Sequence, residues 1–386
     1  MKFNRVFTLL ILCLFFSFTS AQNNKGLKNS EKIKALRDSI DNKIDLSNWL
    51  MHANGFVPMP QIITEPALGG FGLMFTPIFI KPNKTQTKGK YTPPNITAAF
   101  GAYTANDTWG FGALRMASLP KQKLKYRIGA AYGDVNMDFY RELPIVGEQK
   151  FAFNFNSTPV FLSVMREVSK NFFIGLEYFY MKSKVKPQFD LFEPLPFLEK
   201  IDLNNKLSSL GIGLNYDTRD NIFSPNKGLE IGSNYKVNAN WTGSDYEFQN
   251  FNISAFQYFQ TTPKLVSGFR FDSKFIFGDA PFYVEPSVEL RGVPAARYQG
   301  KSTYVIETEQ RYDFSLRWSG IAFTGLGKAL PKGNSFSDAQ LVYNYGVGFR
   351  YLLARVFKLR IGVDVAKSNN DWGYYIVFGS AWNNRN

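Results

Sequence analysis

Apolar and polar residues alternate with a period of two from about Ala67 to the C-terminus, which leaves few folds open to this chain. Between 342 and 353 the apolar positions are Tyr343, Tyr345, Val347, Phe349 and Tyr351, and the positions between them hold Asn, Gly and Arg. Residues two apart lie on the same face of a strand. The pattern therefore predicts strands that each have one apolar and one polar face.

The apolar faces are aromatic at both ends, and the polar faces carry glycine and charges of both signs. The chain holds 38 Phe and 20 Tyr, a large excess. A soluble sandwich would bury a mostly aliphatic face, whereas a transmembrane barrel turns aromatic girdles to lipid and a polar face to its lumen. After the N-terminus no stretch reaches the roughly 18 apolar residues of a spanning helix. The sequence predicts an all-β transmembrane β-barrel over residues 56–386.

At roughly 20 residues per strand and connection, the region after Ala67 has room for about 16 antiparallel strands. Fifteen segments are recognisable: 67–80, 95–104, 109–119, 124–140, 149–168, 171–186, 205–217, 228–241, 247–261, 265–278, 302–314, 317–329, 340–354, 356–368 and 371–382. The sixteenth strand lies either before Ala67 or within 120–170, where 156–159 could form a hairpin turn. Long connections (187–204, 279–301, 330–339) alternate with short ones, which predicts a periplasmic C-terminus.

The first 21 residues have the pattern of a signal peptide, with basic Lys2 and Arg5, an apolar run to Phe18 and a cleavage site after Ala21. The only cysteine, Cys13, lies in that run, so the mature chain is expected to contain no disulfide. Without Lys2 and Arg5 the formal net charge falls from +14 to +12. In an exported chain with scattered cations, this charge favours outer-membrane lipid headgroups as partners and argues against nucleic acid.

Residues 22–55 differ in composition from the rest and form an expected N-terminal periplasmic segment. Ile33, Leu36, Ile40 and Ile44 recur at helical spacing, which predicts a short amphipathic helix over 30–50. This helix could dock on its own barrel or on a partner, or it could serve as a periplasmic handle. The spacing does not separate these alternatives.

Three motifs go beyond a generic barrel. The first is a charged periplasmic turn with Asp217, Arg219, Asp220, Pro225 and Gly228. The second is the pair Arg291 and Gly292 in the long connection 279–301. The third is the pattern of the last strand, formed by Asp371, Gly373, Ile376 and Phe378, with Trp382 near its end.

Together these motifs resemble the BamA/TamA-like superfamily of outer-membrane barrels, also called the bacterial surface antigen family. The resemblance implies sixteen strands, a loop folded into the lumen with Arg291 and Gly292 at its tip, and an insertion signal in the last strand. It also implies a role in inserting barrels or moving polypeptide across the outer membrane. Because few residues precede Ala67, we expect the short branch of the family that lacks polypeptide-transport-associated domains.

The resemblance raises the question of what pairs with Arg291. Family members usually offer an Asp on the strand after the Glu-rich one, where this chain has Gly325. Charged residues expected to face the lumen are Glu307, Glu309, Arg311 and Asp364. Two interpretations stay open: Arg291 pairs with Glu309, because a loop arginine withdrawn from water needs a carboxylate, or these acids are ordinary lumen-lining charges.

The first and last predicted strands are expected to meet at a weak seam, with Gly72 close to Gly379. Glycines contribute little cross-strand contact, and several fall in these two segments. They are Gly69, Gly70, Gly72, Gly373 and Gly379.

Enzymatic chemistry has little support. The single histidine, His52, precedes the barrel, and without cysteine no metal cluster or cofactor site is expected. The leading hypothesis is a non-enzymatic barrel in the outer membrane of a Gram-negative bacterium that inserts or exports proteins together with periplasmic or outer-membrane protein partners. The alternative is a passive pore or a structural barrel subunit of a larger complex. A weak seam would favour the first, and a fully bonded seam the second.

Overall fold

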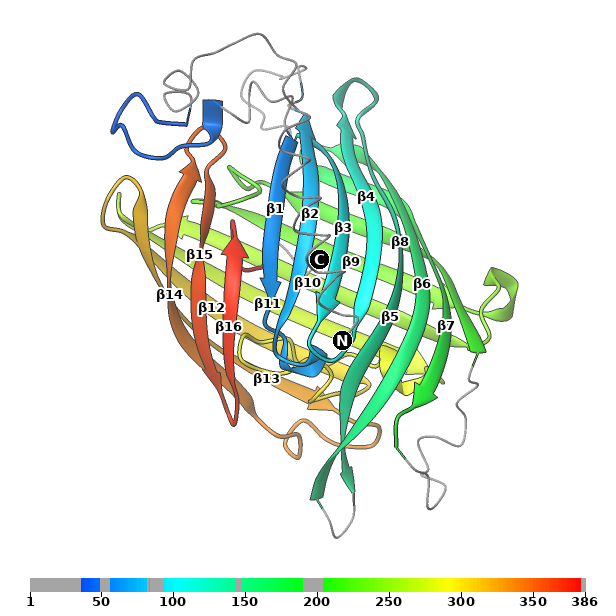
Figure 1. The fold of residues 1–386 in the computed structure, drawn as a ribbon. Coiled ribbons are helices and arrows are strands. Elements are labelled where there is room, and N and C mark those ends of the chain that lie inside the picture. Colours follow the sequence, from blue (N-terminus) through cyan, green and yellow to red (C-terminus); the bar gives the residue numbers. More distant parts are fainter. Residues whose placement is uncertain are drawn as a thin grey trace, which may run out of the picture.

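The computed structural model describes residues 36–48, 56–81, 83, 94–143, 147–189 and 204–382. Sixteen strands form one antiparallel sheet in which each strand pairs with the next along the chain (Figure 1). The strands are β1 (Phe56–Ile63), β2 (Gly72–Lys81), β3 (Asn95–Thr104), β4 (Trp109–Leu119), β5 (Leu124–Leu143), β6 (Gly147–Ser169), β7 (Phe172–Pro187), β8 (Asn204–Asp217), β9 (Gly228–Asn238), β10 (Phe248–Gln260), β11 (Leu265–Gly278), β12 (Ser302–Asp313), β13 (Trp318–Leu330), β14 (Val342–Ala354), β15 (Leu359–Ser368) and β16 (Trp372–Phe378). The predicted sixteen-stranded antiparallel barrel is confirmed. The expected signal peptide, residues 1–21, and His52 lie outside the described residues.

The strand that sequence periodicity left unplaced is β1, which precedes Ala67. The alternative of a hairpin turn at 156–159 is wrong, because β6 runs through this stretch as one strand of 23 residues. Pro159 lies opposite Met181 of β7, while the β5–β6 register has no partner for it. A proline that donates no ladder hydrogen bond is thus accommodated without a turn.

The two ends of the barrel differ in their connections. β1 begins and β16 ends at the proximal end, which is at the top of Figure 1, and the opposite end is the distal end. Between β9 and β15 the short proximal connections 261–264, 314–317 and 355–358 alternate with longer distal ones, of which 279–301 is the most extended. The expected alternation is therefore present from β9 to β15, but the last distal connection, 369–371, is short.

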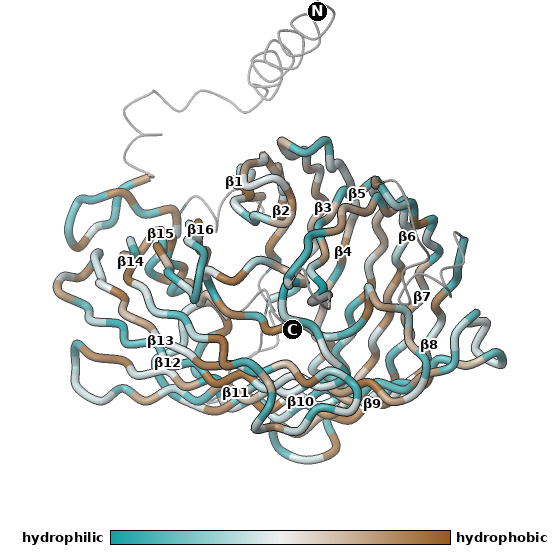
Figure 2. The backbone as a smooth tube through the Cα atoms, turned by 90° about the horizontal axis from the view of Figure 1, so that it is seen from below, coloured by the Kyte–Doolittle hydropathy of each residue, from teal (hydrophilic) through white to brown (hydrophobic). Residues whose placement is uncertain are grey.

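The strand faces follow the period of two. On β14 the side chains of Tyr345 and Val347 point outward and are 54% and 64% exposed, while Asn344 and Arg350 point inward and are buried. Figure 2 shows the strands arranged in a ring. No helix within the described ranges is long and apolar enough to cross a membrane.

The hairpin of β5 and β6 extends past its neighbours at the distal end (Figure 1). Inward-facing Phe139, Phe153 and Phe155 of this hairpin pack on Phe282, which lies in the long distal connection 279–301. The rings of Phe139 and Phe282 meet edge to face at 4.9 Å. An aromatic cluster therefore holds the base of this connection over one side of the distal mouth.

The predicted helix over 30–50 is wrong for residues 36–46. These residues form turns closed by an isolated β-bridge between Arg37 and Ile44. The carboxylate of Asp38 accepts a hydrogen bond from the backbone of Ile40, and that of Asp41 accepts one from Lys43. Aspartates that bond to nearby backbone N–H groups favour turns over helix, and this outweighs the helical spacing of the isoleucines.

Candidate functional site: the strand seam and the lumen loop

The first and last strands lie side by side and antiparallel, yet no backbone ladder joins the described residues of β1 to those of β16 (Figures 1 and 2). β1 pairs only with β2, and β16 pairs only with β15. Across this seam the hydroxyl of Thr64 donates a hydrogen bond to the carbonyl oxygen of Tyr374. Both strands are short, with 8 and 7 residues. The barrel therefore has a gap in its backbone hydrogen bonding at one defined place.

Two prolines in β1 explain why a ladder is difficult to form there. Pro58 lies directly opposite Pro77 of β2. Two prolines cannot exchange N–H···O bonds, so this pair is of the non-hydrogen-bonded kind, and the nitrogen of Pro58 faces the free edge. Pro60, two residues on, faces the same edge. The edge of β1 that faces β16 thus lacks two N–H donors. The Val-Pro-Met-Pro stretch is a sequence signal of an edge strand that alternation alone does not reveal.

The glycines expected to form the seam are mostly elsewhere. Gly69 and Gly70 lie in the distal turn between β1 and β2, with φ of 84° and 75°. Gly72 pairs with Ile63 and Thr104 inside the closed ladder, so the expected approach of Gly72 to Gly379 is wrong. The reason is that 56–63, not 69–80, is the first strand. Of the five glycines, Gly373 lies in β16 and Gly379 follows it.

The distal connection 279–301, called the lumen loop here, enters the barrel and places Arg291 at its centre. The Arg291 guanidinium forms ion pairs with Glu307 (2.9 Å), Glu309 (2.7 Å) and Asp364 (2.9 Å). It also stacks on the ring of Phe323, at 3.4 Å from the ring centroid. The side chains of Glu307 and Asp364 are fully buried. Such a cluster is held together strongly, because each charge would be costly without its partners.

The Arg291–Glu309 ion pair, one of the two interpretations that the sequence left open, is present and forms part of this larger cluster. Asp364 on β15 also binds Arg350, at 2.6 Å, and Glu307 also binds Arg270 of β11, at 3.0 Å. Arg270 and Arg350 were not singled out from the sequence. The fourth charge expected near the loop, Arg311, is not part of the cluster, because it turns toward the proximal end.

Glycines make room for the loop against the barrel wall. At Gly325, where the resemblance implied an Asp, a Cβ atom would lie 2.8 Å from a side-chain carbon of Leu290. Gly292 has φ of 86°, and the backbone of Ser368 lies 3.2 Å from where its Cβ would be. The hydroxyl of Ser368 donates to the Gly292 carbonyl oxygen at 2.7 Å. Asp364 supplies the carboxylate that position 325 does not.

The tip of the loop contacts both sides of the seam. On the β16 side the Gly292 N–H donates to the Tyr375 hydroxyl at 2.7 Å, and Arg297 forms an ion pair with Asp371. On the β1 side the Ala295 N–H donates to the carboxylate of Glu65 at 2.9 Å. The lumen loop thus bridges the distal half of a seam whose strands do not pair with each other.

The chain after β16 turns into the lumen at Gly379, whose φ is 75°. Trp382 ends up fully buried and stacks on Phe256, with ring centroids 5.9 Å apart. Its indole N–H donates to Glu307 at 2.7 Å. The expected strand 371–382 therefore ends at Phe378, and Trp382 is an internal anchor rather than part of a strand surface.

The other expected signal residues are spread over three environments. Asp371 precedes β16 and binds Arg297 of the lumen loop. Gly373 is buried on the inward face of β16, whereas Ile376 and Phe378 have the outward parity of the exposed Trp372. The last strand therefore presents an apolar outward face.

The charged turn between β8 and β9 folds across the proximal end of the lumen. Arg219 binds Asp217 at 2.9 Å and Glu230 at 2.7 Å, while Asp220 binds Lys358 of the β14–β15 turn at 2.7 Å. The carbonyl oxygen of Pro225 accepts from Arg311 at 3.3 Å. Gly228 has φ of 110°, and a Cβ there would lie 2.4 Å from the Thr218 carbonyl oxygen. The motif thus ties distant proximal turns together.

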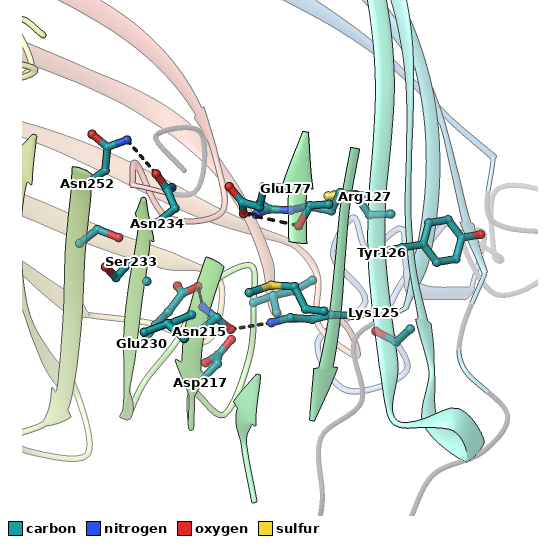
Figure 3. A pocket seen from close by; sticks show the side chains of 18 of the residues that line it. Lys125, Tyr126, Arg127, Glu177, Asn215, Asp217, Glu230, Ser233, Asn234 and Asn252 are labelled. Carbon is teal, nitrogen blue, oxygen red and sulfur yellow. Dashed lines mark hydrogen bonds and ion pairs between the residues drawn. The ribbon is translucent and has the colours of Figure 1, made fainter. Parts of the chain in front are cut away.

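A cavity of about 400 Å³ lies inside the barrel against β3 to β11 (Figure 3). Within it, Lys125 donates to Asn215 at 2.6 Å, and Glu177 forms an ion pair with Lys236 at 3.0 Å. Charges of both signs are paired along its wall. In the part of the chain that the structure describes, no group of three His, Cys, Asp or Glu side chains is arranged to hold a metal ion.

A second charge cluster fixes residues 36–48, called the N-terminal strap here, to the proximal turns. Arg317, between β12 and β13, is buried among Asp38 (2.5 Å), Asp41 (2.7 Å) and Asp45 (2.6 Å). Arg355, between β14 and β15, also binds Asp38, at 2.6 Å. Three acids from a segment predicted to be a helix thus converge on one arginine, which spacing alone did not indicate.

We expect acid to release the strap. The hydrogen bond from Arg355 holds the pKa of Asp38 at about 2, below its usual 3.8, and Arg317 lowers the pKa of Asp41. Because these carboxylates have depressed pKa values in the folded state, their stabilisation is fully present above pH 3.8 and is lost as the pH falls through about 2. A nitroxide on Ile40→Cys should become mobile over this interval in electron paramagnetic resonance spectra. In an Arg317→Gln variant the label should already be mobile at neutral pH; equal immobility in both proteins would contradict the role of the cluster.

The fold and the site define a class of transmembrane barrel. In this class the first and last strands are not paired, and a loop enters the lumen, where a buried arginine binds carboxylates of the wall. The chain belongs to the Omp85 superfamily, because the family model for the Omp85 superfamily domain matches residues 147–381. The resemblance to BamA/TamA-like barrels inferred from the motifs is therefore confirmed.

Solved structures show the same fold. BamA from Haemophilus ducreyi, in a form lacking POTRA domains 1–3, has a TM-score of 0.56 at 11% identity, over 93% of this chain and 83% of that one. CdiB from Escherichia coli has a TM-score of 0.56 at 12% identity, over 83% of this chain and 62% of that one. CdiB from Acinetobacter baumannii has a TM-score of 0.53 at 10% identity, over 92% and 72% of the two chains. No curated protein matches the chain in sequence.

Proposed function

We propose that this protein is a non-enzymatic barrel of the outer membrane of a Gram-negative bacterium that takes part in inserting or exporting proteins. Its proximal end, where β1 begins and β16 ends, faces the periplasm. In this role it contacts membrane lipid and acts with periplasmic or outer-membrane protein partners.

The observation that carries this proposal is the unpaired seam. An assembly or export barrel needs a place where its wall can open without breaking a ladder of backbone hydrogen bonds, and an unpaired strand edge can template another chain. The seam here has no ladder, and prolines remove two donors from its β1 edge. The edge of β16 holds no proline between Trp372 and Phe378, so it keeps all its donors.

The alternative of a passive pore has weaker support. A pore needs a fully bonded wall and an open lumen. Here the lumen loop is fixed in one half of the lumen by buried ion pairs, and the β8–β9 turn spans the proximal end. The cavity of about 400 Å³ inside the barrel is the feature that favours the pore alternative.

A disulfide across the seam tests the two alternatives. Thr64→Cys with Tyr374→Cys, scanned together with pairs at Ile62 and Ile376, should give one or two efficient disulfides, because Cα atoms must come within about 7 Å. In a strain that depends on the protein, oxidation of the locked pair should stop growth, because the seam can no longer open. Added reductant should restore growth.

The matched control is a disulfide between strands that are already paired. Leu73 and Tyr103 lie opposite each other in the β2–β3 ladder and are both exposed outward. Leu73→Cys with Tyr103→Cys should leave growth unchanged when oxidised. If the locked seam supports growth as well as this control, the protein is a pore or a structural subunit rather than an insertion or export barrel.

A further inference from the structure

The outward side of the N-terminal strap carries an apolar surface that the charge cluster does not use. Ile40 and Ile44 are 65% and 59% exposed, and Leu36 is also exposed. The acids of the strap point the other way, where Arg317 and Arg355 neutralise them. The strap is therefore amphipathic, although residues 36–46 are not a helix.

The strap continues the outward face of the barrel. The hydroxyl of Tyr351, on the outward side of β14, donates to the Ile44 carbonyl oxygen at 2.8 Å. The Tyr351 ring packs edge to face on Trp318 of β13, with centroids 5.0 Å apart. Trp and Tyr at the ends of barrel strands form the girdle that sits at a membrane–water interface. The strap thus lies at the height of such a girdle, beside β14 and β15 at the proximal end (Figure 1).

Exposed apolar side chains of the neighbouring turns extend this surface. Phe314 and Leu316, in the turn that holds Arg317, are 56% and 48% exposed, and Val356 in the next proximal turn is 56% exposed. Basic residues flank the strap isoleucines: Arg37 and Lys43 are both exposed. Apolar side chains beside exposed cations are the composition of segments that lie in the interface of an anionic membrane.

We propose that the N-terminal strap is an interfacial membrane anchor, in which Ile40 and Ile44 enter the phospholipid layer at the proximal surface while Arg37 and Lys43 contact anionic headgroups. The partner is a lipid surface, because the patch is continuous with the lipid-facing girdle and carries positive charge at its edge. The inference rests on the proposed placement of the barrel in a membrane. It assigns to the strap a function besides covering the proximal turns.

Fluorescence quenching by lipids tests this anchor. In a Cys13→Ser background, bimane is attached at Ile40→Cys or Ile44→Cys, and the protein is reconstituted in phosphatidylethanolamine vesicles with about one quarter phosphatidylglycerol. Lipids with a nitroxide near the top of the acyl chain should quench both labels several-fold more than a label at Ser335→Cys, in an exposed distal turn. A label at Val347→Cys, outward in the barrel wall, is the positive control.

The controls separate this inference from the proposed placement. One outcome would reject the anchor alone: the Val347 label is quenched by the nitroxide lipid, but the strap labels are quenched no more than the Ser335 label and are quenched by aqueous iodide. The barrel would then be in the membrane, and the strap would not be anchored in lipid. If the Val347 label is not quenched either, the membrane placement fails, and the anchor fails with it.

A second variant separates anchoring from folding. With the label at Leu36→Cys, the double substitution Ile40→Glu and Ile44→Glu should strongly reduce its quenching by lipid, while Ile40→Leu and Ile44→Leu should retain it. Both isoleucines are solvent-exposed in the protein, so the heat-modifiable gel form of the barrel should be unchanged. Unchanged lipid quenching in the Glu variant would overturn the anchor. Vesicles without phosphatidylglycerol should weaken the quenching if Arg37 and Lys43 contact anionic headgroups.

Discussion

Arg291→Ala should lower the free energy of unfolding by about 3 to 5 kcal/mol, because it leaves the buried carboxylates of Glu307 and Asp364 without a main partner. The lumen loop should detach from the barrel wall at the same time. Urea titration in detergent, followed by the shift between folded and unfolded forms on unheated gels, measures the change. Because chemical unfolding reports the whole barrel, hydrogen exchange of the loop amides should be followed in parallel.

Arg297 offers a control in the same loop. Its partners Glu148 and Asp371 are 40% and 30% exposed, so Arg297→Ala should cost no more than about 1 kcal/mol. A double-mutant cycle of Arg291→Ala with Glu309→Ala tests the pairing itself. Contacting residues in one network should show a coupling of about 0.5 to 3 kcal/mol, and fully additive effects would mean that the two side chains do not interact.

Trp382→Ala should also destabilise the protein by about 3 to 5 kcal/mol, the usual cost of truncating a large buried aromatic residue. The indole is 2% exposed, fits over Gly268 and donates to Glu307. Its loss would leave both a cavity and a buried carboxylate oxygen with one donor fewer. The same urea titration measures the change. Trp382→Phe should lower the free energy of unfolding by less than Trp382→Ala, because phenylalanine keeps most of the contact area.

Trp372→Ala is the matched comparison, because Trp372 is the first residue of β16 and is 56% exposed on the outward face. Its truncation in detergent should change the unfolding free energy by well under half as much. If Trp382→Ala and Trp372→Ala had equal effects, the tail would not be anchored in the lumen.

Glu307 joins these two sites. It binds Arg291 of the lumen loop, Arg270 of the wall and Trp382 of the C-terminal tail. The loop also touches both sides of the seam, and the tail continues directly from β16. A movement of β16 at the seam would therefore act on the tail and on the loop through one carboxylate, which links the seam to the lumen in physical terms.

Much of the barrel was predictable from local pattern. A period-two alternation fixes which side chains face outward, because shifting a strand by one residue would move its whole apolar face into the polar lumen. This alternation places Tyr345 and Val347 on the outward face and Arg350 on the inward face, as the structure shows. The loop motif of Arg291 and Gly292 was also recognisable, and so was an acidic inward face on β12. Pro58 and Pro60 are a local signal of the first strand and its edge that the alternation does not contain.

Which of these groups meet depends on the closed fold. Asp364 reaches Arg291 from a strand 73 residues further along the chain, and Asp38 reaches Arg317 across 279 residues. Such contacts depend on barrel closure and loop folding, which no local period encodes. The expected last strand, 371–382, included Trp382, yet the turn at Gly379 carries this residue into the lumen. Local alternation is enough to assign the faces of the strands. The partners of the buried charges depend on the closed fold, because a buried charge pairs with whichever groups the barrel brings within reach.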